Sequence, residues 1–152
     1  MSKQFQRSAF SGVFGTPPLP QGRVVPIREV GDILAARRVV RDAAATLGFQ
    51  GPETTRLVTA ASELARNIVD HAGCGTMCVR PLDLGGRKGI ELEFEDQGPG
   101  IADLERALEE GFSTCGGTGM GLPGARHLMD EMNISSTVGV GTIICSRKWR
   151  RT

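Results

Sequence analysis

Residues 90–101, Ile90-Glu-Leu-Glu-Phe-Glu-Asp-Gln-Gly-Pro-Gly-Ile101, decide the fold. Apolar side chains alternate with glutamates in the first half, which predicts a strand with one buried face and one face in water. Asp96 ends this strand, and Gly98 and Gly100 follow two and four residues later. In such a turn the carboxylate lies beside backbone that carries no side chains. A carboxylate is a strong acceptor for an exocyclic amine such as N6 of adenine. A hairpin-like turn with a helix N-cap explains the same residues, so both interpretations stay open.

Toward the N-terminus, the pattern predicts a strand over residues 23–28, with Pro26 restricting it to an edge or an end of the sheet. Asp32 is suited to cap a helix that runs through residue 47. Four apolar residues mark one side of that helix: Ile33, Leu34, Val40 and Leu47.

A second helix is expected from Pro52 to about Gly73, because its apolar residues recur at helical spacing. Glu63 and Asn67 are four residues apart, so they share a face at the border of this apolar stripe. An amide oxygen suits Mg²⁺, and a carboxylate suits a general base. The alternative is an ordinary amphipathic helix with a polar border.

The remaining elements are expected to be a pair of strands, two short helices and a final hairpin, over residues 76–82, 89–95, 102–110, 122–131, 134–137 and 142–149. Neighbouring strands with grouped helices predict an α+β sandwich. In it, a mixed, mainly antiparallel sheet is covered by helices.

Glycine makes up 21 of the 152 residues, and residues 111–124 hold six of them just before a predicted helix. Free N–H groups and the positive end of the helix dipole favour phosphate binding there, with Ser113, Thr114 and Thr118 as added hydroxyl donors. Residues 119–124 match G-x-G-x-x-G literally, but no predicted strand leads into them, which disfavours a dinucleotide-binding fold. A mobile surface loop is the alternative.

Charge is distributed unevenly along the chain. Residues 52–131 carry seven basic and fourteen acidic side chains, giving −7, whereas both flanking segments are positive. An acidic middle repels a polyanion unless a cation intervenes. With no basic stripe, and with six Phe, one Trp and no Tyr, nucleic acid is not an expected partner.

Four cysteines occur at positions 74, 78, 115 and 145 without a C-x-x-C pair. The spacing of His71, Cys74 and Cys78 suggests zinc, but a fourth ligand is missing, so separate reduced thiols are expected. The N-terminus lacks the apolar run of a signal peptide, and no stretch approaches a membrane span, which favours a cytoplasmic protein. Residues 1–21 are expected to form a mobile arm.

In chain order the three polar segments read E-x-x-x-N, D-x-G-x-G and G-x-G-x-G, and they resemble the N, G1 and G2 boxes of the GHKL ATP-binding superfamily. Residues 62–67, 96–101, 111–114 and 121–126 are similar to the stressosome switch kinases (RsbT-like). This resemblance covers about residues 23–149. It implies a Bergerat-type ATP-binding sandwich over residues 22–152, with a flexible lid at residues 111–119.

By that resemblance Glu63 is the general base, Asn67 the Mg²⁺ ligand, and Asp96 the adenine acceptor with Thr142 near it. Gly98 and Gly100 allow close approach of the nucleotide. The other implied nucleotide-binding positions are Ile101, Ser113, Thr114, Thr118, Gly119, Gly121 and Leu122.

The resemblance also implies an activity: ATP- and Mg²⁺-dependent phosphorylation of Ser or Thr on STAS-domain scaffold proteins. Release of the kinase to bind and activate a PP2C-type phosphatase follows. Two alternatives remain, an anti-sigma factor kinase that sequesters a sigma factor, and a non-catalytic phosphatase-activating module. A homodimer is also left open.

Overall fold

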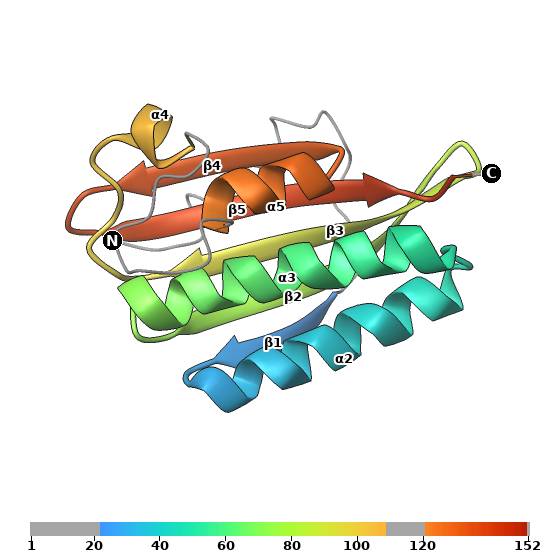
Figure 1. Cartoon of the computed structure of the whole chain (residues 1–152), viewed down its shortest axis with the longest axis horizontal. Coiled ribbons are helices and arrows are strands. Elements are labelled where there is room, and N and C mark those ends of the chain that lie inside the picture. Colours follow the sequence, from blue (N-terminus) through green and yellow to red (C-terminus); the bar gives the residue numbers. More distant parts are fainter. Residues whose placement is uncertain (1–21, 109–120, 152) are drawn as a thin grey trace.

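The computed structural model describes residues 22–108 and 121–151. The predicted N-terminal arm and the predicted lid lie outside this range. Five strands and four helices make up the described elements (Figure 1): β1 (Arg23–Ile27), α2 (Val30–Thr46), α3 (Gly51–His71), β2 (Gly75–Leu84), β3 (Arg87–Asp96), α4 (Leu104–Ala107), α5 (Gly121–Leu128), β4 (Glu131–Thr137) and β5 (Gly141–Trp149).

The strands form one sheet in the order β1-β2-β3-β5-β4, and all four pairings between described strands are antiparallel. Helices α2, α3 and α5 lie together on one face of this sheet (Figure 1). The predicted α+β sandwich is therefore confirmed. The sheet is more regular than the mixed sheet expected, since the described strands contribute no parallel pair.

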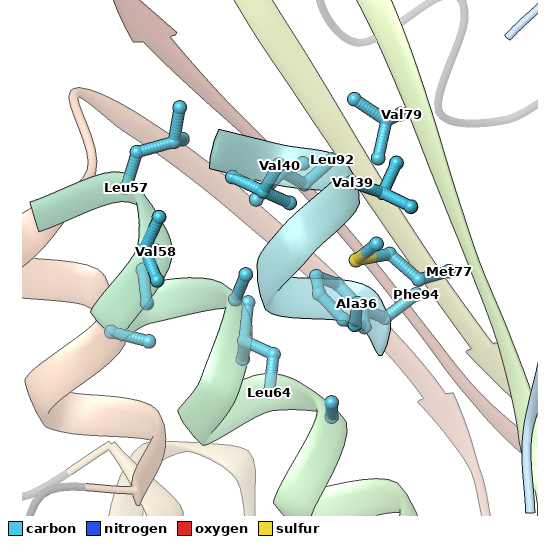
Figure 2. Close-up of a cluster of buried hydrophobic side chains, with 14 of the residues drawn as sticks. Ala36, Val39, Val40, Leu57, Val58, Leu64, Met77, Val79, Leu92 and Phe94 are labelled. Carbon is cyan, nitrogen blue, oxygen red and sulfur yellow. The ribbon is translucent and has the colours of Figure 1, made fainter. Parts of the chain in front are cut away.

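The main core fills the space between the helices and the sheet. The predicted stripe of α3 is buried, including Leu57 and Leu64, and Figure 2 shows it facing α2 residues such as Val40. Leu92 and Phe94 of β3 close this core from the sheet side. Burying each such side chain contributes about 1.5–3 kcal/mol.

Helix α2 differs from the prediction in two details. It begins at Val30 after Glu29, so Asp32 lies inside the first turn and accepts hydrogen bonds from the Arg28 backbone N–H (2.8 Å) and Nε (3.1 Å). Leu34 is 63 % exposed, whereas Ile33 is buried. The buried side of α2 follows the 3–4–4 spacing of residues 33, 36, 40 and 44, and Leu34 lies off that line.

The helix predicted to end near residue 131 ends at Leu128, and the final hairpin is correspondingly longer. Strand pairing takes over the backbone earlier than expected, because the Asp130 N–H donates to the Arg147 carbonyl at 3.0 Å. Glu131 already pairs with Arg147 in the β4–β5 ladder. The short predicted helix over 102–110 is observed as α4, and residues 109 and 110 lie outside the described range.

The glutamate face of β3 was predicted to be in water, and that prediction is wrong. Glu91, Glu93 and Glu95 are only 3–5 % exposed. Arg80 and Arg147 on the neighbouring strands neutralise part of this charge: Arg147 binds Glu91 at 2.9 Å, and Arg80 binds Glu91 at 3.2 Å and Glu93 at 3.5 Å. We call this side of the sheet, opposite the helices, the outer face; it comprises Cys78, Arg80, Glu91, Glu93, Glu95, Ile143, Cys145 and Arg147.

Candidate nucleotide-binding site

Helix α3 carries the predicted Glu63–Asn67 pair toward its C-terminal half. Leu64 and Ile68, the next residue after each, are buried in the core and fix the rotation of the helix. Glu63 and Asn67 are therefore only half-buried and lie on one face. Within the described residues neither side chain forms a hydrogen bond or ion pair, so the carboxylate and the amide are available to a ligand.

Asp96 is the last residue of the central strand β3, between Gly75 of β2 and Thr142 of β5. Its side chain is on the helix side of the sheet: a Cβ on Gly75 would stand 3.1 Å from the Asp96 Cβ and 3.0 Å from Ile68 of α3. Because Ile68 directly follows Asn67, the strand end and the polar face of α3 meet at the same end of the sandwich.

The carboxylate of Asp96 is held by the turn that follows it. Its Oδ1 accepts a hydrogen bond from the Gly98 N–H at 2.9 Å, which fixes the side-chain orientation. With the residue 9 % exposed, Asp96 presents a positioned acceptor at the end of the central strand rather than a freely rotating surface charge. Such an acceptor suits a planar donor such as an exocyclic amine.

Gly98 and Gly100 have packing roles within the chain itself. A Cβ on Gly98 would lie 2.6 Å from the Ala72 Cβ, at the end of α3. Gly100 has φ +80°, and a Cβ there would lie 2.5 Å from the Thr137 carbonyl oxygen. Close approach of neighbouring backbone, as well as the nucleotide approach that we predicted, therefore requires glycine at both positions.

Ser136 connects three parts of this turn and was not identified from the sequence. Its Oγ accepts a hydrogen bond from the Ile101 N–H at 2.7 Å and lies 2.8 Å from the Thr142 Oγ1. Ser136 and Thr142 are partners in the β4–β5 register. Counting back from the Gly139–Gly141 turn would have placed a hydroxyl opposite Thr142, which is the signal the sequence offered.

Helix α5 brings the second glycine motif to the same layer. It packs against α3, and its first turn buries Leu122 in the main core. Gly121, at the helix start, has φ +34°, and a Cβ there would meet nothing within 4 Å. The predicted positions Ser113, Thr114, Thr118 and Gly119 lie outside the described residues. The predicted site residues that the structure describes all lie on the helix side of the sheet. They come from α3, from the turn after β3, from Thr142 and from the start of α5.

The donor set fits Mg·ATP. The Asp96 carboxylate, which the following turn holds in place, suits the adenine ring of a nucleotide. The Asn67 amide oxygen, which has no partner among the described residues, suits a hard cation. Residues 22–108 and 121–151 contain no group of three or more His, Cys, Asp or Glu side chains placed to hold a metal ion. Among the described residues, Cys74, Cys78 and Cys145 are not part of a disulfide.

Helices cover one face of the sheet, α3 carries an amide–carboxylate pair, and a carboxylate ends the central strand on the same side. Together these features define an ATP-binding domain of the histidine kinase type. The chain belongs to the family described as "Histidine kinase-like ATPase domain", whose model matches residues 28–148. It is 48 % identical over 120 residues to the serine/threonine-protein kinase RsbT of Bacillus subtilis, covering 79 % of this chain and 90 % of that protein.

A second relative is the anti-sigma F factor of Caldanaerobacter subterraneus subsp. tengcongensis, 34 % identical over 75 % of this chain and 82 % of that protein. The predicted kinship with RsbT-like kinases and their anti-sigma factor relatives is confirmed. No helix in the described part of the chain has the length and apolar character to cross a bilayer.

Two solved structures share the fold. The RsbU and RsbW domains of a Mycobacterium tuberculosis protein match with TM-score 0.57 and 19 % identity, covering 86 % of this chain and 33 % of that one. The mycobacterial sensor histidine kinase MprB matches with TM-score 0.52 and 23 % identity, covering 86 % of this chain and 98 % of that one. These matches confirm the predicted Bergerat-type architecture.

Proposed function

We propose that residues 22–152 form an ATP- and Mg²⁺-dependent protein serine/threonine kinase domain that acts on STAS-domain scaffold proteins in the cytoplasm. The observation that carries the proposal is the half-buried Glu63–Asn67 pair, which makes no hydrogen bond or ion pair within the described residues and lies on the same side of the sheet as Asp96. The 48 % identity to RsbT supports the choice of this kinase class over other users of the fold.

Glu63 is assigned the role of general base. A serine or threonine hydroxyl must lose its proton as it attacks the γ-phosphorus, and a carboxylate within hydrogen-bond reach accepts that proton. Leu64, fully buried beside it, limits the rotation of α3 and so keeps the carboxylate oriented. General-base catalysis of this kind contributes about 10²–10⁴-fold to the rate.

Asn67 is assigned to magnesium and Asp96 to adenine. The Asn67 amide oxygen is one turn along the same helix face from Glu63, so the metal and the base come from one rigid element. Magnesium, when bound, neutralises charge on the phosphates during transfer. In a segment of net charge −7 (residues 52–131), a cation also offsets repulsion between the protein and the triphosphate.

Partner switching completes the proposed function. After phosphorylating its scaffold, the kinase dissociates and binds a PP2C-type phosphatase, which it activates in a stressosome pathway. RsbT and the anti-sigma F factors, the relatives that match over most of the chain, support this placement.

The test is transfer of radiolabelled γ-phosphate from Mg·ATP to purified STAS-domain proteins. The proposal predicts labelling of one serine or threonine, lost when that residue is changed to alanine. Asp70→Asn is the matched control for Glu63→Gln, because Asp70 is an exposed acid on the same helix. Absence of transfer to any STAS protein, with nucleotide binding intact, overturns the kinase assignment.

The alternatives are separated by binding. Co-purification with a sigma factor, and inhibition of that factor, would support the anti-sigma function that the second relative's name describes. Phosphatase activation that survives Glu63→Ala without any kinase activity would support a non-catalytic module. Light scattering of the purified chain decides whether it is a homodimer.

A further inference from the structure

Three polar side chains form a row across three neighbouring strands at one end of the sheet. Asp96 of β3 pairs with Thr142 of β5, and Thr142 pairs with Ser136 of β4. Residues directly opposite each other on antiparallel strands point to the same face. Each member of the row is two residues from an apolar side chain that belongs to the main core or packs against it, so the row faces the helix side. Those apolar residues are Phe94, Ile144 and Ile134.

Ser136 has a fixed donor on one side. The Ile101 N–H donates a hydrogen bond to the Ser136 Oγ at 2.7 Å. A backbone N–H has no lone pair, so Ser136 is the acceptor in this bond, and its single proton is left for another partner. Two acceptors are within reach of that proton: the Thr142 Oγ1 at 2.8 Å and the Gly141 carbonyl oxygen at 3.3 Å.

The two distances favour Thr142 as the acceptor. Hydrogen bonds between two oxygen atoms are usually about 2.5–3.0 Å long, and the contact with the Gly141 carbonyl is longer than that. When Ser136 donates to Thr142, the Thr142 hydroxyl keeps its own proton. Within residues 22–108 and 121–151, the Thr142 Oγ1 has no further hydrogen-bond partner, so this proton is available to a ligand.

We propose that Ser136 is a positioning residue for the nucleobase: it donates to Thr142, so that Thr142 offers its O–H beside the Asp96 carboxylate. This inference rests on the proposed function, in which Asp96 accepts a hydrogen bond from N6 of adenine. The row then offers an acceptor and a donor next to each other. Adenine matches this arrangement, because its N6 amino group donates and the ring nitrogens N1 and N7, on either side of N6, accept.

The same bonds connect the nucleobase with the backbone beyond the Asp96 turn. They run from the Ile101 N–H through Ser136 and Thr142 to the ring nitrogen. Hydrogen bonds in such a chain polarise one another, so a bond from Thr142 to the base strengthens the bond that Ser136 accepts from Ile101. Binding of adenine is therefore expected to be detectable at the Ile101 amide.

Nucleotide analogues test the role of Ser136 in the full chain. Ser136→Thr and Ser136→Val introduce side chains of the same shape, and only threonine keeps the hydroxyl. The affinities of ATP, 1-deaza-ATP and 7-deaza-ATP are measured by competition with a fluorescent nucleotide. The wild type and Ser136→Thr should bind one of the analogues about 3–10-fold more weakly than ATP, which corresponds to one net hydrogen bond and identifies the ring nitrogen.

In Ser136→Val this difference should fall below about twofold, because the Thr142 hydroxyl is no longer oriented. General loosening of the fold weakens binding of ATP and the analogue alike, so the ratio of affinities separates positioning from stability. Ser135→Ala is a further control, since Ser135 is a half-buried residue of the same strand on the opposite face. It should keep the wild-type ratio.

The Ile101 amide provides a second measurement. Its proton resonance should move downfield when ATP binds to the wild type, and should move less with the discriminating analogue or in Ser136→Val. Equal affinity ratios in Ser136→Thr and Ser136→Val, or no weaker binding of either analogue by the wild type, overturn the inference while ATP binding stays intact. Absence of ATP binding to the wild type would instead overturn the proposed function, and this inference with it.

Discussion

Gly141 packs directly against the backbone of Asp96: a Cβ on Gly141 would overlap the Asp96 carbonyl oxygen and lie 2.9 Å from the Cα of Gln97. Gly141 also has φ +147°, a conformation that other residues rarely adopt. The first residue of β5 is therefore part of the support for the proposed adenine acceptor.

Gly141→Ala should destabilise the protein, because strain and overlap arise at one position. Strained backbone alone costs about 1–3 kcal/mol, and a loss of about 2 kcal/mol lowers Tm by about 4–8 °C in a chain of this size. Gly139→Ala is the control, since Gly139 also has positive φ (+81°) but a Cβ there meets nothing within 4 Å. An equal effect of the two substitutions would contradict the packing role. Nucleotide affinity should fall only for Gly141→Ala.

Ser136→Ala should cost about 1–3 kcal/mol, because the Ile101 N–H loses its acceptor in a half-buried turn. Urea unfolding measures the change. Ser136→Thr keeps the hydroxyl and should retain most of the stability. If the alanine and threonine variants are equally stable, the hydrogen bond is not the source of the effect.

Glu63→Gln should reduce phosphoryl transfer by about 10²–10⁴-fold and leave ATP affinity nearly unchanged. Asn67→Ala should instead weaken binding of Mg·ATP. Calorimetry with and without magnesium, combined with single-turnover transfer, separates the two effects. Equal loss of binding in both variants would contradict the division of roles.

Arg147→Ala should be among the most destabilising single changes on the outer face. Arg147 is 2 % exposed and binds Glu91 at 2.9 Å, so removing it leaves a buried carboxylate short of its partner, at a cost of about 3–5 kcal/mol. Lys88→Ala, which removes an exposed pair with Asp83, should cost less than about 1 kcal/mol. The comparison is made by chemical denaturation, and similar losses would contradict the assigned burial.

Asp32 should titrate below its ordinary pKa of 3.8, chiefly because Arg28 donates side-chain and backbone hydrogen bonds to it. A lowered folded-state pKa means that the stabilising contribution is present above the unfolded value and is lost as pH falls through the folded value. Carbon-detected NMR titration measures the shift. In Arg28→Ala the pKa of Asp32 should move back toward 3.8; an unchanged value would exclude Arg28 as the cause.

Much of the fold could be predicted from periodicity. The stripe of α3 from Leu57 to Ile68 and the apolar residues of β3 each follow from one local pattern, and both sets of side chains face the core as expected. The end of α5 could not be predicted from local pattern, because Asp130 and Glu131 are drawn into pairing with a strand that is distant in sequence. Leu34 was misplaced because hydrophobicity alone does not fix helix rotation.

The site was predictable to the extent that its residues form short motifs. Glu63 and Asn67 follow from helical spacing, and Asp96 from the strand–turn pattern. Ser136 was missed because its role depends on the position of Ile101, 35 residues away. Burial of Glu91 and Glu93 was missed because their charge partners, Arg80 and Arg147, come from other strands.

One face of β3 carries apolar side chains and the other carries glutamates, so only one register with β2 and β5 places both sets correctly. A slip of one residue against β2 or β5 would turn Glu93 toward Leu64 and Ile68, and Leu92 toward Arg80 and Arg147. Buried carboxylates would then lack arginine, and buried arginines would lack carboxylate, at a cost of several kcal/mol each. Misaligned pairing is thereby disfavoured on both sides of the sheet at once, so the register of the central strand is specified twice.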